Sequence, residues 1–272
     1  MWLKMKEKSR FYSVFGENLV PNKNTFRSQS GNALFLVLIA IVLFGYLSFT
    51  FTQNTRSNSS DLTKEKTQLL VSEITSYAQQ VRSGVQSLLI SGCLETEINF
   101  DNPIVAGYTN ASAPLDGSCD VFGRNGANLN YQRPNTNALD INQSAHTLYG
   151  QWFFPEGTCV KGLGTGSDTC WTDSDNTNED LVLVLPFVSR ATCIALNNAH
   201  GIGTPDAAPP EDTGRMWPDS HPKFTGTFID GNRIDSENSI ASDIIGKPSG
   251  CVEGDTNPSA GTYHYYISLI TR

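Results

Sequence analysis

Oxygen-bearing side chains gather between residues 173 and 180 of this sequence, where they could bind a cation. The stretch reads DSDNTNED and places carboxylates at Asp173, Asp175 and Asp180. Calcium takes roughly six to eight oxygen ligands of this kind. The EF-hand pattern fails, because Thr177 and Asn178 stand where an Asp or Asn and a Gly are expected. We therefore expect a solvated acidic turn before a buried strand and no resident cofactor, with calcium at the three aspartates as the alternative.

The histidines and glycines do not form a catalytic motif. Four histidines fall on different predicted elements: His146, His200, His221 and His264. The sequence has neither the GxSxG elbow of serine hydrolases nor the HExxH motif of zinc proteases. The glycine-rich VKGLGTGSDT is not followed by GK[ST], so it does not predict a phosphate-binding loop. We expect that the protein is not an enzyme.

Six cysteines favour an oxidising compartment, where disulfides persist. They allow fifteen pairings, and the sequence does not choose among them. Sequential pairing is the simplest arrangement: Cys93 with Cys119, Cys159 with Cys170, and Cys193 with Cys251. Each closure would contribute about 3–4 kcal/mol. None of the cysteines forms a CxxC or has a histidine at zinc-finger spacing, so a zinc site is not expected.

One uncharged stretch, Ala33 to Phe51, dominates the N-terminal part of the chain. As a helix rising about 1.5 Å per residue it is about as long as the hydrocarbon core of a membrane is thick. Residues 1–31 carry six basic and two acidic side chains, a net charge of +4, and the total of −8 leaves −12 for residues 32–272. Basic flanks stay in the cytoplasm, so we expect a single-pass inner-membrane protein with an extracytoplasmic C-terminal part. An acidic exported domain does not favour nucleic-acid binding.

An amphipathic helix is predicted from Asp61 to Ser91. Apolar residues recur there every three or four positions, at Leu70, Ile74, Tyr77, Val81, Val85 and Leu88. Gly92 is a natural helix stop. The apolar stripe could pack on the globular domain of the same chain or on partner helices, and the sequence leaves both open.

The rest of the chain predicts an α+β head. Four stretches are expected to be strands: Leu148–Phe154, Leu181–Val188, Phe224–Ile229 and Tyr263–Ile270. Pro186 indicates an edge or a strand end. Asp230-Gly231 is expected to turn a hairpin into Asn232–Ile234.

A short helix and a long loop separate these strands. The helix is predicted over Ser189–Ala199, capped by Ser189 and ended by His200-Gly201. It would place Cys193 where it can tie to the C-terminal region. Gly201–Pro222 holds five prolines and is expected to be an irregular surface loop. The expected organisation is a basic cytoplasmic leader (1–31), a membrane-spanning and then amphipathic helix (32–92), and an antiparallel-sheet head braced by disulfides (93–272).

This layout resembles the type IV pilins and the pseudopilins of type II secretion. The shared features are the basic leader, the glycine, about twenty apolar residues, the amphipathic helix and the disulfide-bearing head. The resemblance implies that a prepilin peptidase cleaves after Gly31 and leaves Asn32 as the new N-terminus. It also implies that the apolar helix later packs into a filament core, with other pilin-like subunits and the assembly machinery as partners. The loop closed by Cys193 and Cys251 would take the place of the family's C-terminal disulfide-bounded region.

The sequence departs from the family pattern at the fifth mature position. The family usually carries Glu there and this chain has Leu36. A buried carboxylate needs a partner, and in the family it pairs with the free amine of a neighbouring subunit. A chain with Leu36 cannot form that pair, which resembles a minor pseudopilin more than a major one.

Two functions follow from these observations. The first is a pilin-like or pseudopilin-like structural subunit, anchored in the inner membrane and assembled into a surface or periplasmic filament. The second is an uncleaved, signal-anchored extracytoplasmic binding or adhesion protein with the same anchor.

Overall fold

The computed structural model describes residues 32–164, 179–217, 222–229, 232–235 and 244–272, with side chains described outside 32–33 and 49–63. The chain divides into two compact units, Met1–Ser57 and Asn58–Arg272. Helix α1 (Asn32–Ile90) contributes to both, so the predicted segment from Asp61 lies within a helix that has already begun. The helix ends before Gly92, whose φ of +104° only glycine adopts readily, and Cys93 N–H donates to Leu88 O at 3.1 Å.

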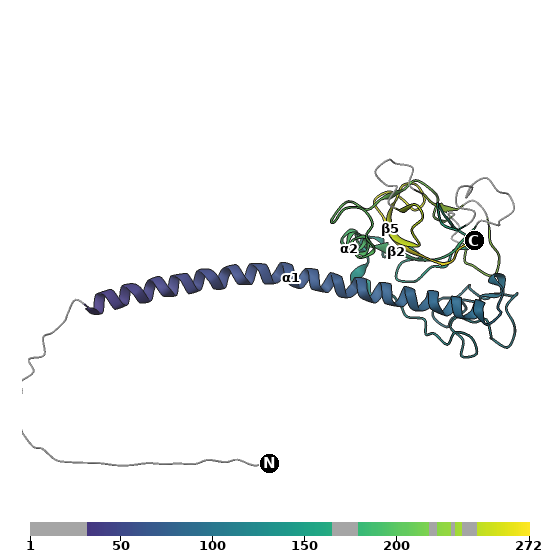
Figure 1. Ribbon diagram of the computed structural model, residues 1–272, viewed down its shortest axis with the longest axis horizontal. Coiled ribbons are helices and arrows are strands. Elements are labelled where there is room, and N and C mark those ends of the chain that lie inside the picture. The colour runs from purple at the N-terminus through teal and green to yellow at the C-terminus, as the bar shows by residue number, and fades with distance from the viewer. Residues whose placement is uncertain (1–31, 165–178, 218–221, 230–231, 236–243) are drawn as a thin grey trace, which may run out of the picture. The chain divides into compact units, whose positions relative to one another are not determined.

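The second unit is a mixed α/β head. Among the described residues four strands form its main sheet in the order β2-β6-β5-β3 (Figure 1). Their bounds are Leu181–Val188 (β2), Glu211–Asp212 (β3), Ser249–Gly254 (β5) and Tyr263–Ile270 (β6). A small pair joins β1 (Cys159–Val160) to β4 (Arg233–Ile234), and three short 3-10 helices lie at Glu95–Glu97, Thr136–Ala138 and Ile141–Gln143.

The prediction of an antiparallel sheet is therefore wrong in part. β6 pairs antiparallel with both β2 and β5, but β3 pairs parallel with β5. The reason is that β3 is only two residues long and reaches the sheet edge from a long loop instead of a hairpin. The sheet is mixed, and the head combines helices and strands as expected.

Strand β2 is apolar along its whole length because both of its faces are covered. All eight of its residues are buried. Leu183 and Leu185 belong to the core shared with α1, whereas Val182 and Val184 belong to a second core on the other face, with Phe153 and Trp217. An unbroken apolar run is expected of a strand without a solvent face. Pro186 lies near the end of this edge strand, as predicted.

Helix α2 (Arg190–His200) follows the prediction closely. Ser189 Oγ accepts the N–H of Thr192 at the N-cap, and Gly201 ends the helix with φ +65°. Cys193 on α2 forms a disulfide with Cys251 on β5, and α2 lies beside that strand (Figure 1). This predicted disulfide is confirmed, and it joins two elements that are far apart in the sequence.

Two predicted strands are not strands. Leu148–Phe154 begins as turns and pairs only at Phe153 with Val184, because Gly150 has a φ of +72° and the Trp152 N–H donates to Tyr131 Oη instead of a neighbouring strand. Phe224–Ile229 is irregular around Gly226, whose φ is +93°. Both segments pack their aromatic side chains in the core, and the first touches the sheet only through the bridge between Phe153 and Val184.

The predicted hairpin and loop also need correction. Residues 230–231 lie outside the described residues, but Arg233–Ile234 pairs parallel with β1 and not with the preceding segment. The region 201–217 is largely irregular, as predicted, yet it is not only surface. It contains β3 and buries Asp212, Met216 and Trp217. Pro-rich composition predicted the backbone irregularity but not the burial of these side chains.

Candidate functional site

The expected processing junction lies at the start of α1. Gly31 is outside the described residues, and Asn32 is the first residue of the helix. Leu36, at the position where the family carries Glu, is 60% exposed.

An apolar surface follows this junction; we call residues 34–47 of α1 the apolar segment. Its large hydrophobic side chains are between 38% and 75% exposed within the described chain: Leu34, Phe35, Leu36, Val37, Leu38, Ile39, Ile41, Val42, Leu43, Phe44, Tyr46 and Leu47. Across the part of the chain that the structure describes, no helix combines the length and hydropathy of a membrane span.

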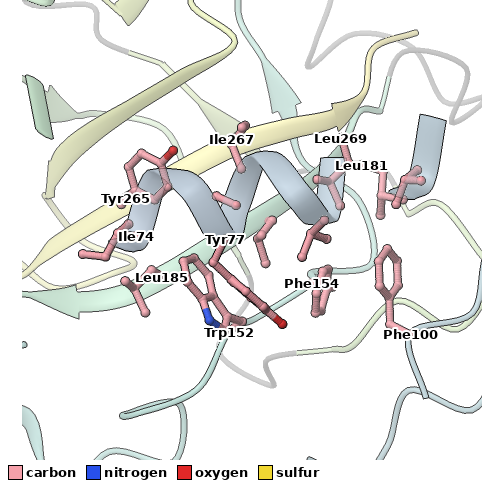
Figure 2. Packing of buried hydrophobic residues seen from close by; sticks show 14 of the residues in the cluster. Ile74, Tyr77, Phe100, Trp152, Phe154, Leu181, Leu185, Tyr265, Ile267 and Leu269 are labelled. Carbon is pink, nitrogen blue, oxygen red and sulfur yellow. The ribbon is translucent and has the colours of Figure 1, made fainter. Parts of the chain in front are cut away.

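The amphipathic stripe of α1 is covered by the head of the same chain. All six predicted residues are at most 8% exposed: Leu70, Ile74, Tyr77, Val81, Val85 and Leu88. Figure 2 shows Ile74 and Tyr77 among residues of the head, and the rings of Tyr77 and Trp152 lie 5.1 Å apart. The sequence is compatible with this stripe packing either on the head of the same chain or on partner helices. The structure shows it packed on the head of the same chain.

The calcium candidates are not brought together by the described structure. Asp173 and Asp175 lie outside the described residues. Asp180 is fully buried, and its two carboxylate oxygens accept backbone N–H groups from Val160 and Arg272 at 2.9 and 3.1 Å. Burial raises the pKa of Asp180 to about 7. Its observed contacts fasten the C-terminal end to β1, and the described residues contain no cluster of three metal-binding side chains.

Two of the three expected disulfides are confirmed. Cys93 pairs with Cys119 and Cys193 pairs with Cys251, with S–S distances of 2.04 and 1.97 Å. Cys159 is also disulfide-bonded. Its expected partner, Cys170, lies outside the described residues.

A partly buried charge network connects residues in or next to β1, β3 and β4, and no sequence motif marks it. Asp235 is fully buried and receives Lys161 Nζ at 3.1 Å and an Arg233 guanidinium nitrogen at 3.3 Å. Asp212 Oδ1 accepts the N–H groups of Asp235 and Gly214. Burial raises the pKa of Asp212 to about 7, and the neighbouring Asp235 adds to the rise. These residues are separated in sequence, so only the fold places them together.

A cleft lies near one end of β2. His146 lines it and His264 lies close by, although the sequence places these two histidines on different predicted elements. We call this cleft the His146 cleft; it has a volume of about 260 Å³. The ring of Phe187 lies 4.5 Å from that of His146 and 5.1 Å from that of His264. Trp217 meets His264 edge-on at 5.0 Å. The lining residues come from four segments that are distant in the sequence, so no sequence motif marks the cleft.

His264 has a structural role below this cleft. It is fully buried, its Nδ1 accepts the Phe187 N–H at 3.4 Å, and its Nε2 lies 2.7 Å from Thr262 Oγ1. Since Nδ1 is the acceptor, the proton belongs on Nε2, which donates to Thr262. Burial lowers the pKa of His264 to about 3, so the ring is neutral at physiological pH.

No protein-family model, curated protein or solved structure matches this chain.

Proposed function

We propose that this protein is a minor pilin-like subunit, held in the inner membrane by its apolar helix and assembled into a surface or periplasmic filament. The observation that carries the proposal is the contrast along α1. The stripe from Leu70 to Leu88 is buried by the head, whereas the large hydrophobic side chains of the apolar segment are 38–75% exposed within the described chain.

An apolar helix surface of this length is unfavourable in water, so we expect it to pack against lipid or against other protein subunits. Soluble monomers rarely leave contiguous apolar patches larger than a few hundred Å² in water. Lipid can cover the segment before assembly, and helices of other subunits can cover it afterwards. The basic leader, with a net charge of +4, supports an orientation in which the head leaves the cytoplasm.

Leu36 supports a minor role. A carboxylate at this position would need a cationic partner in an apolar surrounding. Leu36 places an aliphatic side chain there. It can pack beside other apolar helices but cannot form an ion pair with the amine of a neighbouring subunit. We propose that such a subunit occupies few positions in a filament instead of forming its shaft.

Mass spectrometry of the mature N-terminus tests the proposal. In a host with a prepilin peptidase, the mature chain should begin at Asn32. Gly31→Leu should abolish cleavage, and Gly16→Leu, a matched change elsewhere in the leader, should leave it intact. A chain that still begins at Met1 whether or not the peptidase is present would rule out the pilin-like function.

The second candidate is an uncleaved, anchored binding protein, and the His146 cleft favours it because a purely structural head needs no such site. Fractionation separates the two. Sheared surface filaments that contain the protein support the subunit, and recovery only with the inner membrane supports the anchored binding protein.

A further inference from the structure

We infer that the His146 cleft binds a neutral, hydroxyl-rich small molecule of the size of one sugar ring, such as a terminal hexose of a glycan. The inference concerns the head alone, so it holds whether the leader is cleaved or kept. It rests on the construction of the cleft, its size, the absence of Asp, Glu, Lys and Arg from its described lining residues, and the strained backbone at Phe187.

Four segments that are distant in sequence contribute the described lining residues of the cleft. The segment 136–149 is tied to the end of β2, where Asp140 N–H donates to Phe187 O at 2.8 Å. The connection between β5 and β6 forms a second wall, and Met216 N–H binds it at Asn257 O at 3.2 Å. The lining residues are Gln143, His146, Phe187, Trp217, Asn257, Pro258, Ser259, Ala260 and Thr262. Backbone hydrogen bonds therefore fix the walls before any ligand arrives.

The size of the cleft matches a small ligand. Its volume of about 260 Å³ corresponds to roughly eight or nine water molecules, since each occupies about 30 Å³ in the liquid. A single sugar ring fits such a space, whereas drug-sized ligands use pockets of roughly 300–1,000 Å³.

The described lining residues carry polar groups but no Asp, Glu, Lys or Arg. Among the described lining residues only His146 could offer an ion a counter-charge, so the site favours neutral ligands. The amides of Gln143 and Asn257 and the hydroxyl of Ser259 can both donate and accept hydrogen bonds. Sugar hydroxyls need partners of both kinds. Phe187 and Trp217 add apolar surface for the C–H groups of a ring.

The floor of the cleft is held in a strained conformation. Phe187 has a φ of +58°, which is a true outlier for a bulky side chain. Such a conformation costs about 1–3 kcal/mol and persists only where neighbours enforce it. Here the hydrogen bonds to Asp140 and His264 and the ring of His146 enforce it. Strained residues of this kind cluster in binding sites, which supports a preorganised site.

Ligand-detected saturation-transfer NMR on the full chain in detergent tests the inference. The probes are D-glucose, D-galactose and N-acetyl-D-glucosamine, with D-glucuronate and D-glucosamine as charged analogues. At least one neutral sugar should receive saturation and the charged analogues should not. Gln143→Ala and Ser259→Ala should each weaken binding about two- to tenfold, as expected for one lost hydrogen bond.

Gln86→Ala is the matched control, because Gln86 is exposed on α1 outside the lining of the cleft. It should bind like the natural chain, and near-UV circular dichroism should show that every variant is folded. The inference is overturned by any of three results on folded protein: no transfer to the neutral sugars, equal transfer to the charged analogues, or binding that neither cleft variant weakens. None of these results bears on leader cleavage, so the proposed subunit function stands or falls separately.

Discussion

The two apolar parts of α1 differ in how far their side chains are exposed within the described chain. In the apolar segment, Leu34 is 75% exposed and even Ile39, the most covered of its large hydrophobic side chains, is 38% exposed. In the stripe farther along the helix, Val81 and Val85 are fully buried against the head. Within the described residues the same helix therefore carries one apolar stripe that the head buries and one apolar segment whose side chains are largely exposed.

The difference follows from the spacing of the polar residues. Residues 64–90 alternate apolar and polar positions with the helical period, so one face can meet the head while the other meets water. The apolar segment has no charged face, and no side of it is suited to water. The periodic part of α1 is therefore suited to lie between the head and water, whereas the apolar segment is suited to a surrounding that is apolar on every side.

The largest expected effect comes from placing a charge at matched valines. Val81→Asp puts an unpaired carboxylate into the fully buried stripe, which should cost more than about 4 kcal/mol and largely unfold the head. Val42→Asp, at a position 61% exposed, should leave the head folded. Near-UV circular dichroism and protease resistance measure both. A folded head in the Val81 variant would contradict the packing described here.

Matched isoleucines give a smaller, graded effect. Ile74→Ala removes a side chain that is 2% exposed and should lower the free energy of unfolding by about 2–5 kcal/mol. Ile41→Ala, at 67% exposure, should change it by less than about 0.5 kcal/mol. Urea unfolding of the full chain in detergent, followed by tryptophan fluorescence, provides the values. Equal losses in the two variants would remove the distinction between the two surfaces.

The pH dependence of stability belongs to the head and should not involve the apolar segment. Asp180 and Asp212 have folded-state pKa values of about 7, above the unfolded value of about 3.9, so their protons stabilise the fold and this contribution falls as pH rises through about 7. His264, with its pKa lowered to about 3, contributes stability that rises with pH up to about 6.5–7. Between pH 6.5 and 8 the two carboxyls outweigh the histidine, and the free energy of unfolding should fall on the order of 1 kcal/mol.

Urea midpoints across this pH range test the sign. Asp180→Asn should reduce the decrease in the free energy of unfolding between pH 6.5 and 8. Asp206→Asn, at an exposed position, should leave that decrease unchanged. Ile41→Ala should show the same decrease in the free energy of unfolding over this pH range as the natural chain. A stability that rises from pH 6.5 to 8 would mean that these carboxyls are not held protonated by burial.

Matched tyrosines give the smallest effect. Tyr77 Oη accepts the backbone N–H of Gln132 at 3.1 Å, so Tyr77→Phe should cost about 0.5–1.5 kcal/mol. Tyr46, 66% exposed in the apolar segment, should tolerate the same change without a measurable effect on unfolding. Thermal melts of the pair would show whether this hydrogen bond helps hold α1 on the head.

Local patterns were enough to predict the elements whose signals lie within a few residues. The stripe of α1, the cap and stop of α2, and strands β2 and β6 were predicted within a residue or two. Capping and periodicity act between near neighbours, so they can be recognised in sequence. The sequential pairing of Cys93 with Cys119 and of Cys193 with Cys251 was also predicted.

Features that depend on contacts between residues distant in the sequence could not be predicted. Phe224–Ile229 has strand-like composition, but tertiary packing places its aromatic side chains in the core without a partner strand. The parallel pairing of β3 with β5 depends on a long loop, which no local signal describes. The His146 cleft brings together residues of four segments that are distant in the sequence. Of the three aspartates that suggested a calcium site, only Asp180 lies among the described residues.

The central claim is that the apolar segment is covered from outside the chain, and cysteine accessibility tests it most directly. Ile41→Cys and Leu69→Cys place a thiol at positions that are 67% and 72% exposed in the isolated chain. In native membranes opened by freeze–thaw, a water-soluble maleimide should label position 69 readily and position 41 at least about tenfold more slowly. Equal labelling at the two positions would show that water reaches the apolar segment and would contradict the account.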